Sequence, residues 1–213
     1  MDHNPDRPSK RVLEHPWYDG LVEDEAVIAA VQRGDRDAFT ILVDRYQDRL
    51  YSAALRLLGS PSDAADVVQE TFTRAFVHVH ELRPSTLKAW LFRVATNCAR
   101  DQQRRVMRRP TTPLETEDSK VIELPDRSAG PEEDALALER SQAIKYALAE
   151  LSFEHREVVV LRDINDLSYE EIAAVLKCPV GTVRSRLNRG RAQLVEQLRQ
   201  SPSGLFAASG DVR

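Results

Sequence analysis

The stretch Leu167–Leu198, LSYEEIAAVLKCPVGTVRSRLNRGRAQLVEQL, decides the fold of the C-terminal part of the chain. It opens with Ser168-Tyr-Glu-Glu171, a capping box in which the serine hydroxyl and the glutamate carboxylate each satisfy a backbone N–H at the start of a helix. The buried side of this short helix is expected to consist of Ile172, Ala173 and Leu176. Lys177-Cys178-Pro179 then forms a tight connection, and its proline favours a new helix start. The pattern predicts a helix-turn-helix.

The second helix of this pair has one apolar face and one basic face. At about 100° per residue, Val183, Leu187 and Leu194 fall within about 40° of one another and should pack inward. An arginine fork can read guanine, asparagine can pair with adenine, and flanking arginines can hold phosphates. The alternative is a solvated basic face, but the capped helix, the tight turn and the lack of acids at i±4 favour DNA recognition. The candidate residues are Arg184, Ser185, Asn188 and Arg189, with Arg186 and Arg191 on the flanks.

Charge is distributed unevenly along the 213 residues, whose net charge is −4. Arginines dominate residues 97–109, and basic residues dominate 177–199, whereas acids dominate 111–139. Two basic blocks separated by an acidic one predict two nucleic-acid contacts joined by a segment that makes no third contact.

Helical spacing dominates the chain, and no strand alternation is sustained. We therefore expect an all-α protein of two small helical domains joined by a flexible acidic linker that prolines punctuate. The expected helices cover about 23–32, 39–58, 62–76, 85–109, 132–150, 153–163, 168–177 and 180–199. The expected domains are a disordered N-terminal arm (1–21), an N-terminal domain (22–110), the linker (111–131), a C-terminal domain (132–199) and a flexible tail (200–213). The arm and the tail could also be regulatory.

The helix expected over 85–109 carries two stripes. Its core stripe comprises Leu87, Leu91, Val94 and Cys98. Beside it lies a polar stripe of Asn97, Asp101, Arg104 and Arg108, with Trp90 at its N-terminal end. Such a stripe could bind single-stranded DNA by stacking and phosphate contacts. Alternatively, Asp101 forms ion pairs with Arg104 or Arg105 on the helix surface, and Trp90 belongs to the core.

Three blocks of sequence carry a resemblance to a known family. They are Asp63-AADVVQET-Phe72, then Trp90-LFRVAT-Asn97 with Asp101 and Arg104-Arg105 behind it, and finally Leu167-SYEEI-Ala173 with Val180-GTVRSR-Leu187. In this order the blocks resemble a bacterial sigma factor of the extracytoplasmic-function (ECF) class. The similarity covers about residues 22–110, as region 2, and 132–199, as region 4.

The resemblance implies roles for each block. The helix Ser62–Phe76 would dock on the clamp of the largest RNA polymerase subunit through Asp66, Gln69, Glu70 and Phe72. The −10 element would be held by Trp90, Asn97, Asp101, Arg104 and Arg105, and the −35 element would be read by the helix-turn-helix residues given above. The acidic linker would thread toward the polymerase active-site cleft, and an anti-sigma factor is an expected partner. Without the resemblance, Ser62–Phe76 is an ordinary acidic amphipathic helix.

One loop departs from the family pattern. A flipped −10 base is usually captured by a loop that carries an aromatic residue and a glycine, whereas Leu82 and Pro84 stand in those places here. Leucine cannot stack on a base as an aromatic ring does, and proline stiffens the loop. We therefore expect weaker base capture, or capture by other residues.

Enzymatic and metal-binding functions find little support. No glycine-rich phosphate loop or nucleophile motif occurs, and His78 and His80 have no ligand cluster beside them. We expect no catalysis, no cofactor and no metal. Cys98 and Cys178 are far apart in sequence, which fits a reducing cytoplasm and gives no indication of a redox role. The longest apolar run, Ala26–Val31, is too short to cross a bilayer, and the N-terminus lacks the pattern of a signal peptide.

Two function hypotheses remain. The chain is either a sigma factor, which needs core RNA polymerase to bind promoters tightly, or a free-standing helix-turn-helix regulator with an N-terminal sensor or dimerisation domain. The blocks Asp63–Phe72 and Asn97–Arg105 favour the sigma factor.

Overall fold

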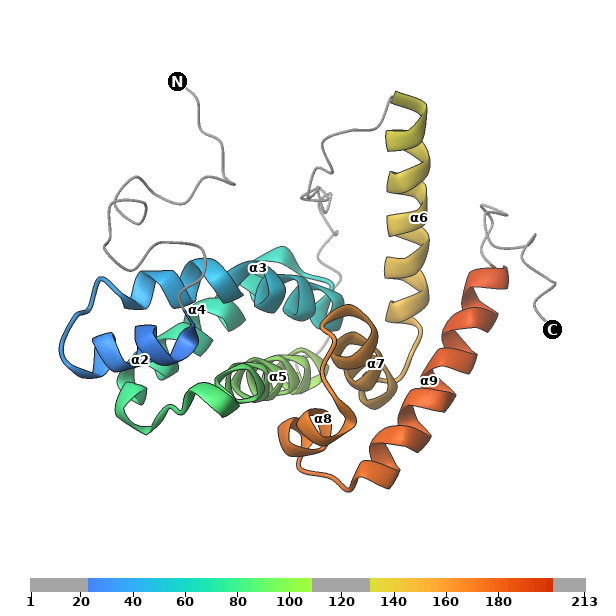
Figure 1. Cartoon of the computed structure of the whole chain (residues 1–213). Helices are drawn as coiled ribbons and strands as arrows, with labels where there is room; N and C mark the ends of the chain where they lie inside the picture. Colours follow the sequence, from blue (N-terminus) through green and yellow to red (C-terminus); the bar gives the residue numbers. More distant parts are fainter. Residues whose placement is uncertain (1–22, 109–130, 201–213) are drawn as a thin grey trace.

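The computed structural model describes residues 23–108 and 131–200, and every regular element within them is helical (Figure 1). The elements are α2 (Asp24–Gln32), α3 (Phe39–Leu58), α4 (Pro61–Val77), a 3-10 turn η1 (Val79–Glu81), α5 (Pro84–Arg108), α6 (Pro131–Ala149), α7 (Phe153–Val159), a π-helical turn η2 (Val160–Ile164), α8 (Tyr169–Leu176) and α9 (Val180–Gln200). The predicted all-α class is confirmed. The predicted arm and nearly all of the predicted linker and tail lie outside the described residues, so their flexibility stays a prediction.

Local signals set most of the helix boundaries. Gly59 ends α3 in the left-handed conformation at φ 74°, which costs glycine nothing, and its N–H donates to the Leu55 carbonyl. Ser60 then caps α4 by accepting from the Asp63 N–H at 3.3 Å, with Pro61 in the first turn. The capping box of α8 forms as predicted: the Glu171 N–H donates to the Ser168 hydroxyl at 3.1 Å, and the Ser168 N–H donates to the Glu171 carboxylate at 2.7 Å.

The helix expected over 153–163 is interrupted. Its α-helical part ends at Val159, and the chain then widens into η2. Asn165 accounts for the widening, because its backbone N–H and its side-chain amide both donate to the Val160 carbonyl, at 3.2 and 3.0 Å. Asn165 is only 2% exposed, so its amide needs this partner. The chain is thus helical over the whole expected range, but the sequence did not indicate that its second part is π-helical.

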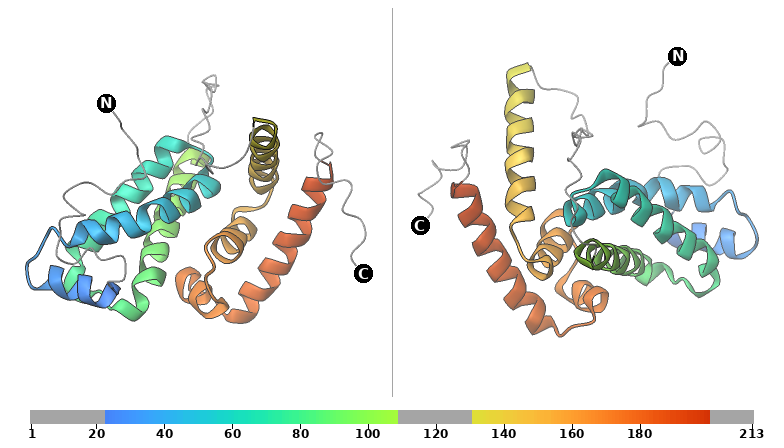
Figure 2. Two further views of the ribbon diagram at one scale, coloured as in Figure 1. Left: turned by 45° about the horizontal axis from the view of Figure 1, so that its top comes forward. Right: turned by 180° about the vertical axis from the view of Figure 1, so that it is seen from behind.

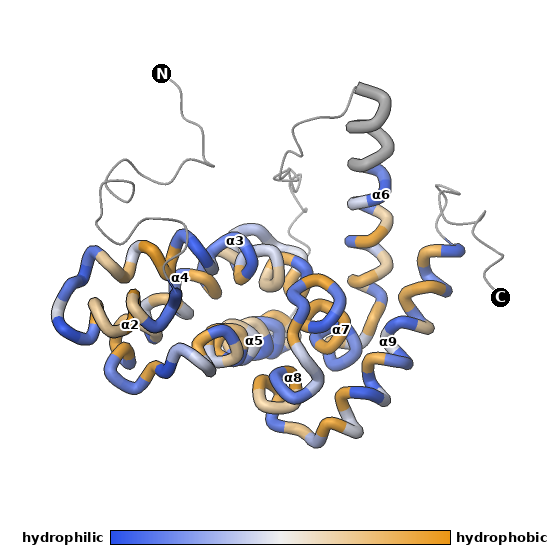
Figure 3. The backbone as a smooth tube through the Cα atoms, viewed as in Figure 1, coloured by the Kyte–Doolittle hydropathy of each residue, from blue (hydrophilic) through white to orange (hydrophobic). Residues whose placement is uncertain are grey.

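Helices α2 to α5 form an N-terminal unit, and α6 to α9 form a C-terminal unit (Figure 2). In the N-terminal unit α3, α4 and α5 pack around side chains that are almost fully buried, among them Leu42, Leu50, Leu87 and Leu91. Buried Tyr46 donates its hydroxyl to Asp24 at 2.5 Å and so ties α2 to α3. In the C-terminal unit α9 packs against α6, α7 and α8, and Figure 3 shows its apolar residues alternating with polar ones along the helix.

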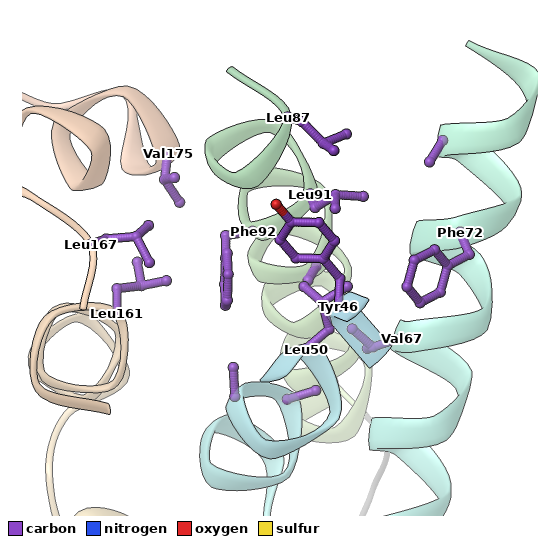
Figure 4. Packing of buried hydrophobic residues seen from close by; sticks show 14 of the residues in the cluster. Tyr46, Leu50, Val67, Phe72, Leu87, Leu91, Phe92, Leu161, Leu167 and Val175 are labelled. Carbon is purple, nitrogen blue, oxygen red and sulfur yellow. The ribbon is translucent and has the colours of Figure 1, made fainter. Parts of the chain in front are cut away.

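The two units share one continuous hydrophobic core, in which α8 packs against α5. Figure 4 shows the ring of Phe92 on α5 directed toward Leu161, Leu167 and Val175 of the other unit. Phe92 is 1% exposed. This contact was not anticipated from the sequence, which indicated two units but gave no sign that they pack together.

Over residues 23–108 and 131–200, no helix has the length and apolar character that crossing a membrane requires.

Helices α7 and α9 approach closely at Gly190. A Cβ placed there would lie 2.9 Å from Val159 Cγ2 and 3.2 Å from the His155 carbonyl oxygen. At Gly181, near the start of the same helix, no atom lies within 4 Å of a new Cβ.

We predict that Gly190→Ala lowers the free energy of unfolding by about 1–2 kcal/mol, because overpacking between α7 and α9 outweighs the better helix propensity of alanine. Gly181→Ala should be neutral or slightly stabilising. Urea denaturation followed by circular dichroism tests both, and equal effects of the two substitutions would contradict the close approach.

Candidate nucleic-acid interface

The basic face of α9 is open to solvent. Arg184, Ser185, Asn188 and Arg189 are all exposed, as predicted. Val183 and Leu187 on the opposite face are 0% and 1% exposed, and Leu194 is half-buried. Burial of the apolar face therefore fixes the direction in which the four polar side chains point.

Tyr169, the first residue of α8, lies between two arginines. The guanidinium carbon of Arg162 is 5.4 Å from the ring centroid, and that of Arg184 is 5.7 Å from it. Cation–π contacts at exposed sites contribute about 0.5–1 kcal/mol each. The ring orients Arg184 without neutralising its charge. Sequence analysis missed Tyr169, although its place beside the capping serine was visible.

The two flanking arginines of α9 are paired with acids from other elements. Arg186 Nη2 lies 2.6 Å from Glu154 Oε2 of α7. Arg191 Nε lies 3.0 Å from Asp163 Oδ2 of η2, and a second guanidinium nitrogen contacts the same carboxylate. The hydrogen bond to Asp163 raises the pKa of Arg191. The sequence showed no acid four residues from these arginines on α9. The tertiary fold instead brings Glu154 of α7 and Asp163 of η2 next to them.

The polar stripe of α5 is partly exposed. Asp101, Arg104 and Arg105 are exposed, whereas Asn97 and Trp90 are half-buried. Trp90 packs partly against the core, and Asp101 lies 3.8 Å from Arg104 Nη1 as an i,i+3 ion pair. The surface ion pair and the core contact of Trp90, raised from the sequence as the alternative to DNA binding, are therefore both present, and such an exposed pair holds its side chains only weakly.

Helix α4 forms a ridge between two depressions. An apolar groove of about 710 Å³ lies between α3 and α4, and a polar cleft of about 450 Å³ lies between α4 and α5. Gln69 lines both, Phe72 lines the groove, and Asp66 and Glu70 line the cleft. The four side chains expected to contact polymerase thus lie on one ridge.

Phe72 differs from the other three residues of this set. It is only 8% exposed, and its ring packs edge-to-face on Phe39 at 6.3 Å, whereas Asp66, Gln69 and Glu70 are exposed. Phe76, one helical turn further along α4, is 39% exposed and packs on the same Phe39 ring at 5.2 Å. Sequence analysis did not single out Phe76, although its i+4 spacing from Phe72 was a usable signal.

The polar cleft also contains Cys98, which is half-buried rather than part of the closed core. Burial raises the pKa of its thiol, with Glu70 and Asp101 contributing in the same direction and Arg74 opposing them. A raised pKa keeps the thiol protonated at neutral pH, and a protonated thiol is a poor nucleophile.

The loop before α5 carries Leu82 and Pro84 in the places where the family pattern has an aromatic residue and a glycine. Leu82 is 5% exposed and belongs to the core, and the carbonyls of Val79 and Leu82 accept from the Gln32 amide at 2.9 and 3.4 Å. Pro84 is the first residue of α5.

His78 and His80 are exposed beside this loop, and His78 Nδ1 lies 3.3 Å from Glu81 Oε1. Across the part of the chain that the structure describes, no group of three or more metal-ligating side chains is found.

Comparison with known proteins places this arrangement in a family. The family model for Sigma-70 region 2 matches residues 42–109, and that for Sigma-70 region 4 matches residues 141–194. The ECF RNA polymerase sigma factor SigW of Bacillus subtilis is 37% identical over 179 residues, which cover 81% of this chain and 95% of SigW. The ECF RNA polymerase sigma-E factor of Escherichia coli K12 is 37% identical over 177 residues, which cover 79% of this chain and 90% of that protein.

Solved structures agree. CnrH in complex with the cytosolic domain of CnrY matches with a TM-score of 0.63 at 31% identity, covering 84% of this chain and 98% of that chain. The sigma factor RpoE in complex with the anti-sigma factor NepR from Bartonella quintana matches with a TM-score of 0.57 at 26% identity, covering 76% and 96%.

The chain therefore belongs to the ECF class of the sigma-70 family. It is a transcription initiation factor that directs RNA polymerase to specific promoters, which decides between the two function hypotheses.

The pairing of Arg186 with Glu154 yields a prediction. Glu154→Gln should strengthen promoter binding by the polymerase holoenzyme about two- to fivefold and steepen its salt dependence by about one unit, because Arg186 is released for a phosphate. Filter binding at several salt concentrations measures both. Glu196→Gln, which removes an acid bonded to Gln200 near the far end of α9, is the control. Unchanged affinity and slope in Glu154→Gln would show that Arg186 makes no phosphate contact.

Proposed function

We propose that the two units divide promoter recognition between them. Residues 22–110 bind core polymerase and the −10 element, residues 132–199 read the −35 element, and residues 111–131 thread toward the polymerase active-site cleft. The observation that carries the proposal is the exposed face of α9, where four exposed polar side chains lie opposite an apolar face on which Val183 and Leu187 are buried. A helix that presents such a face beyond a capped short helix has the geometry needed to enter a major groove.

The six candidate −35 residues have different tasks. Arg184 is the base reader, because Tyr169 orients it and no carboxylate neutralises it in the described contacts. Ser185, Asn188 and Arg189 extend the same face. Arg186 and Arg191 hold phosphates at the edges of the groove and exchange their carboxylate partners for DNA, which costs little because exposed pairs contribute only about 0–1 kcal/mol.

The −10 element is held by the polar stripe of α5. Arg104 and Arg105 provide positive charge on an exposed surface, whereas Trp90 and Asn97 are half-buried. Asp101 lies between Asn97 and Arg104 along the helix. Leu82 takes no part in base capture, because its side chain is committed to the core. Strand binding on this surface therefore depends on α5 itself rather than on the preceding loop.

The ridge of α4 is the polymerase-binding surface. Asp66, Gln69 and Glu70 provide polar contacts, and Phe72 acts mainly by shaping the adjacent groove from the core side. The solved relatives are described in complexes with partner proteins, one of them an anti-sigma factor. We propose that an anti-sigma factor also binds this chain. The chain performs no catalysis of its own, because polymerase supplies the chemistry, and it acts in the cytoplasm, where polymerase is located.

The combined substitution Gln69→Ala and Glu70→Ala tests the polymerase surface. It should weaken binding to core polymerase about tenfold or more while leaving the helix content unchanged, since both side chains are exposed. Fluorescence titration with purified core enzyme measures the affinity. Glu25→Ala with Asp37→Ala removes two exposed acids elsewhere in the same unit and should leave the affinity unchanged. Wild-type affinity in the first variant would refute this placement.

Arg184→Ala tests the −35 surface. Transcription from a preferred promoter should fall, because the apparent free energy of promoter binding becomes weaker by roughly 1–3 kcal/mol. The preference for one base at a single −35 position should also become weaker. Run-off transcription on promoters varied base by base gives both quantities, with Arg199→Ala in the last turn of α9 as the control. An equal loss on every promoter sequence would assign Arg184 to the phosphate backbone instead.

A further inference from the structure

The polar cleft between α4 and α5 adjoins two surfaces of the N-terminal unit that have separate proposed tasks. Asp66, Gln69 and Glu70 of the α4 ridge line one wall. Asp101 and Arg105 of the proposed −10 surface line the other wall. The cleft measures only about 450 Å³, so charges on the two surfaces are close enough to influence one another across it.

Arg74 of α4 lies in the wall of this cleft, between the two surfaces. Its Nε donates to Glu70 Oε1 at 2.6 Å, one helical turn earlier on the same helix. This hydrogen bond raises the pKa of Arg74, and Cys98 and Asp101 on the opposite wall contribute in the same direction. Glu70 therefore accepts the hydrogen bond, while Asp101 lies within electrostatic reach of the same guanidinium.

The ion pairs at this cleft can be exchanged at low cost. The side chains of Arg74 and Glu70 are 49% and 48% exposed. That of Asp101 is 65% exposed, and its contact with Arg104 is long, at 3.8 Å. Because exposed ion pairs hold their partners only weakly, the carboxylate that is available to Arg74 decides where its guanidinium lies.

Asp101 opposes strand binding on the surface to which it belongs. It lies one helical turn before Arg104 and Arg105 on α5, and all three side chains are exposed. A carboxylate beside two arginines attracts their guanidinium groups and repels the phosphates of an anionic strand. A third guanidinium that paired with Asp101 would remove much of this opposition, and Arg74 lies across the cleft in a position to do so.

We propose that Arg74 is a positioning residue that couples polymerase binding to binding of the −10 strand. Core polymerase engages Glu70, so Arg74 moves from Glu70 to Asp101. Arg104 and Arg105 then lose a competing carboxylate and bind strand phosphates. The inference rests on the proposed roles of the α4 ridge and of the polar stripe of α5. Because coupling between two sites is reciprocal, the −10 strand strengthens polymerase binding by the same factor.

Substitutions in the free full-length chain test the exchange without polymerase. Glu70→Gln keeps the size of the side chain and removes its charge, so it imitates the loss of Glu70 to polymerase. It should strengthen binding of a labelled single-stranded oligonucleotide about two- to fivefold. The oligonucleotide carries the −10 element of a promoter that the holoenzyme transcribes, and fluorescence anisotropy at low salt measures the affinity.

A double-mutant cycle separates the movement of Arg74 from the general effect of removing an acid. In an Arg74→Gln background, Glu70→Gln should lose most of its effect on oligonucleotide affinity, because no guanidinium remains to move to Asp101. An equal gain of affinity in both backgrounds would overturn the proposal.

The coupling factor of the holoenzyme provides a second measurement. It is the ratio of the affinities of the chain for core polymerase with and without saturating oligonucleotide. Arg74→Gln should lower this factor about two- to fivefold. Arg74→Lys should keep most of it, because an ammonium group can also pair with either carboxylate. Arg33→Gln, which removes an exposed cation outside the cleft, should leave the factor unchanged. A wild-type factor in Arg74→Gln, or an equal loss in Arg74→Lys and Arg74→Gln, would overturn the proposal.

Two results separate the role of Arg74 from the proposed function. Wild-type affinity of the Gln69→Ala and Glu70→Ala variant for core polymerase would refute the α4 ridge as the polymerase surface, and the coupling through Glu70 with it. If that variant loses affinity while Arg74→Gln keeps the wild-type coupling factor, the ridge stands and only the role of Arg74 is refuted. Circular dichroism verifies that each variant keeps its helix content, as the exposure of Arg74 and Glu70 predicts.

Discussion

The packing of the inner face of α9 against α7 and α8 is the constraint on which the proposed promoter-reading surface depends. Val183 and Leu187 are buried completely or nearly so, and Gly190 allows α9 to approach α7 so closely that a methyl group would contact Val159. Because the helix cannot rotate without exposing these side chains, Arg184 and Asn188 point outward in a fixed direction. The capping box of α8 contributes to the same end, since it sets where that helix begins and so where Tyr169 lies beneath Arg184. Burial of the apolar side chains thus fixes the positions and directions of the polar side chains on the opposite face of α9.

Electrostatics then differentiates side chains that look equivalent in sequence. Arg184 and Arg186 are two residues apart on one helix, yet one lies over an aromatic ring and the other is paired with Glu154. The same contrast separates Arg191, paired with Asp163, from Arg189, which is exposed. Carboxylates near a DNA-binding face weaken unspecific attraction to phosphate, which is the sequence-independent part of DNA affinity. A protein with net charge −4 can in this way present a basic recognition helix whose affinity for DNA without the preferred sequence remains low.

Much of the fold followed from local rules. The extent of α3 over 39–58, the capping box of α8 and the two faces of α9 each depend on residues a few positions apart, and all were predicted correctly. Features that depend on tertiary contacts were not. Glu154 and Asp163 approach α9 only after folding, and Asn165 widens the helix after Val159 through a hydrogen bond that no spacing rule indicates. Phe92 read as one apolar residue among others on α5, and neither Arg100 nor Glu157 carried a signal that they pair across 57 positions of sequence.

A buried ion pair between Arg100 of α5 and Glu157 of α7 helps to determine how the N-terminal and C-terminal units fit together. Removal of two charges from water offsets most of their mutual attraction, so such a pair adds little net stability while strongly disfavouring arrangements in which one charge stays buried alone. Arg100 and Glu157 therefore specify how the two units fit together more than how tightly they hold. The Phe92 contacts add apolar area between the units, and Arg156 and Arg49 add hydrogen bonds to the carbonyls of Leu57 and Asn165. Apolar burial thus holds the units together, while the directional polar contacts select one arrangement of them.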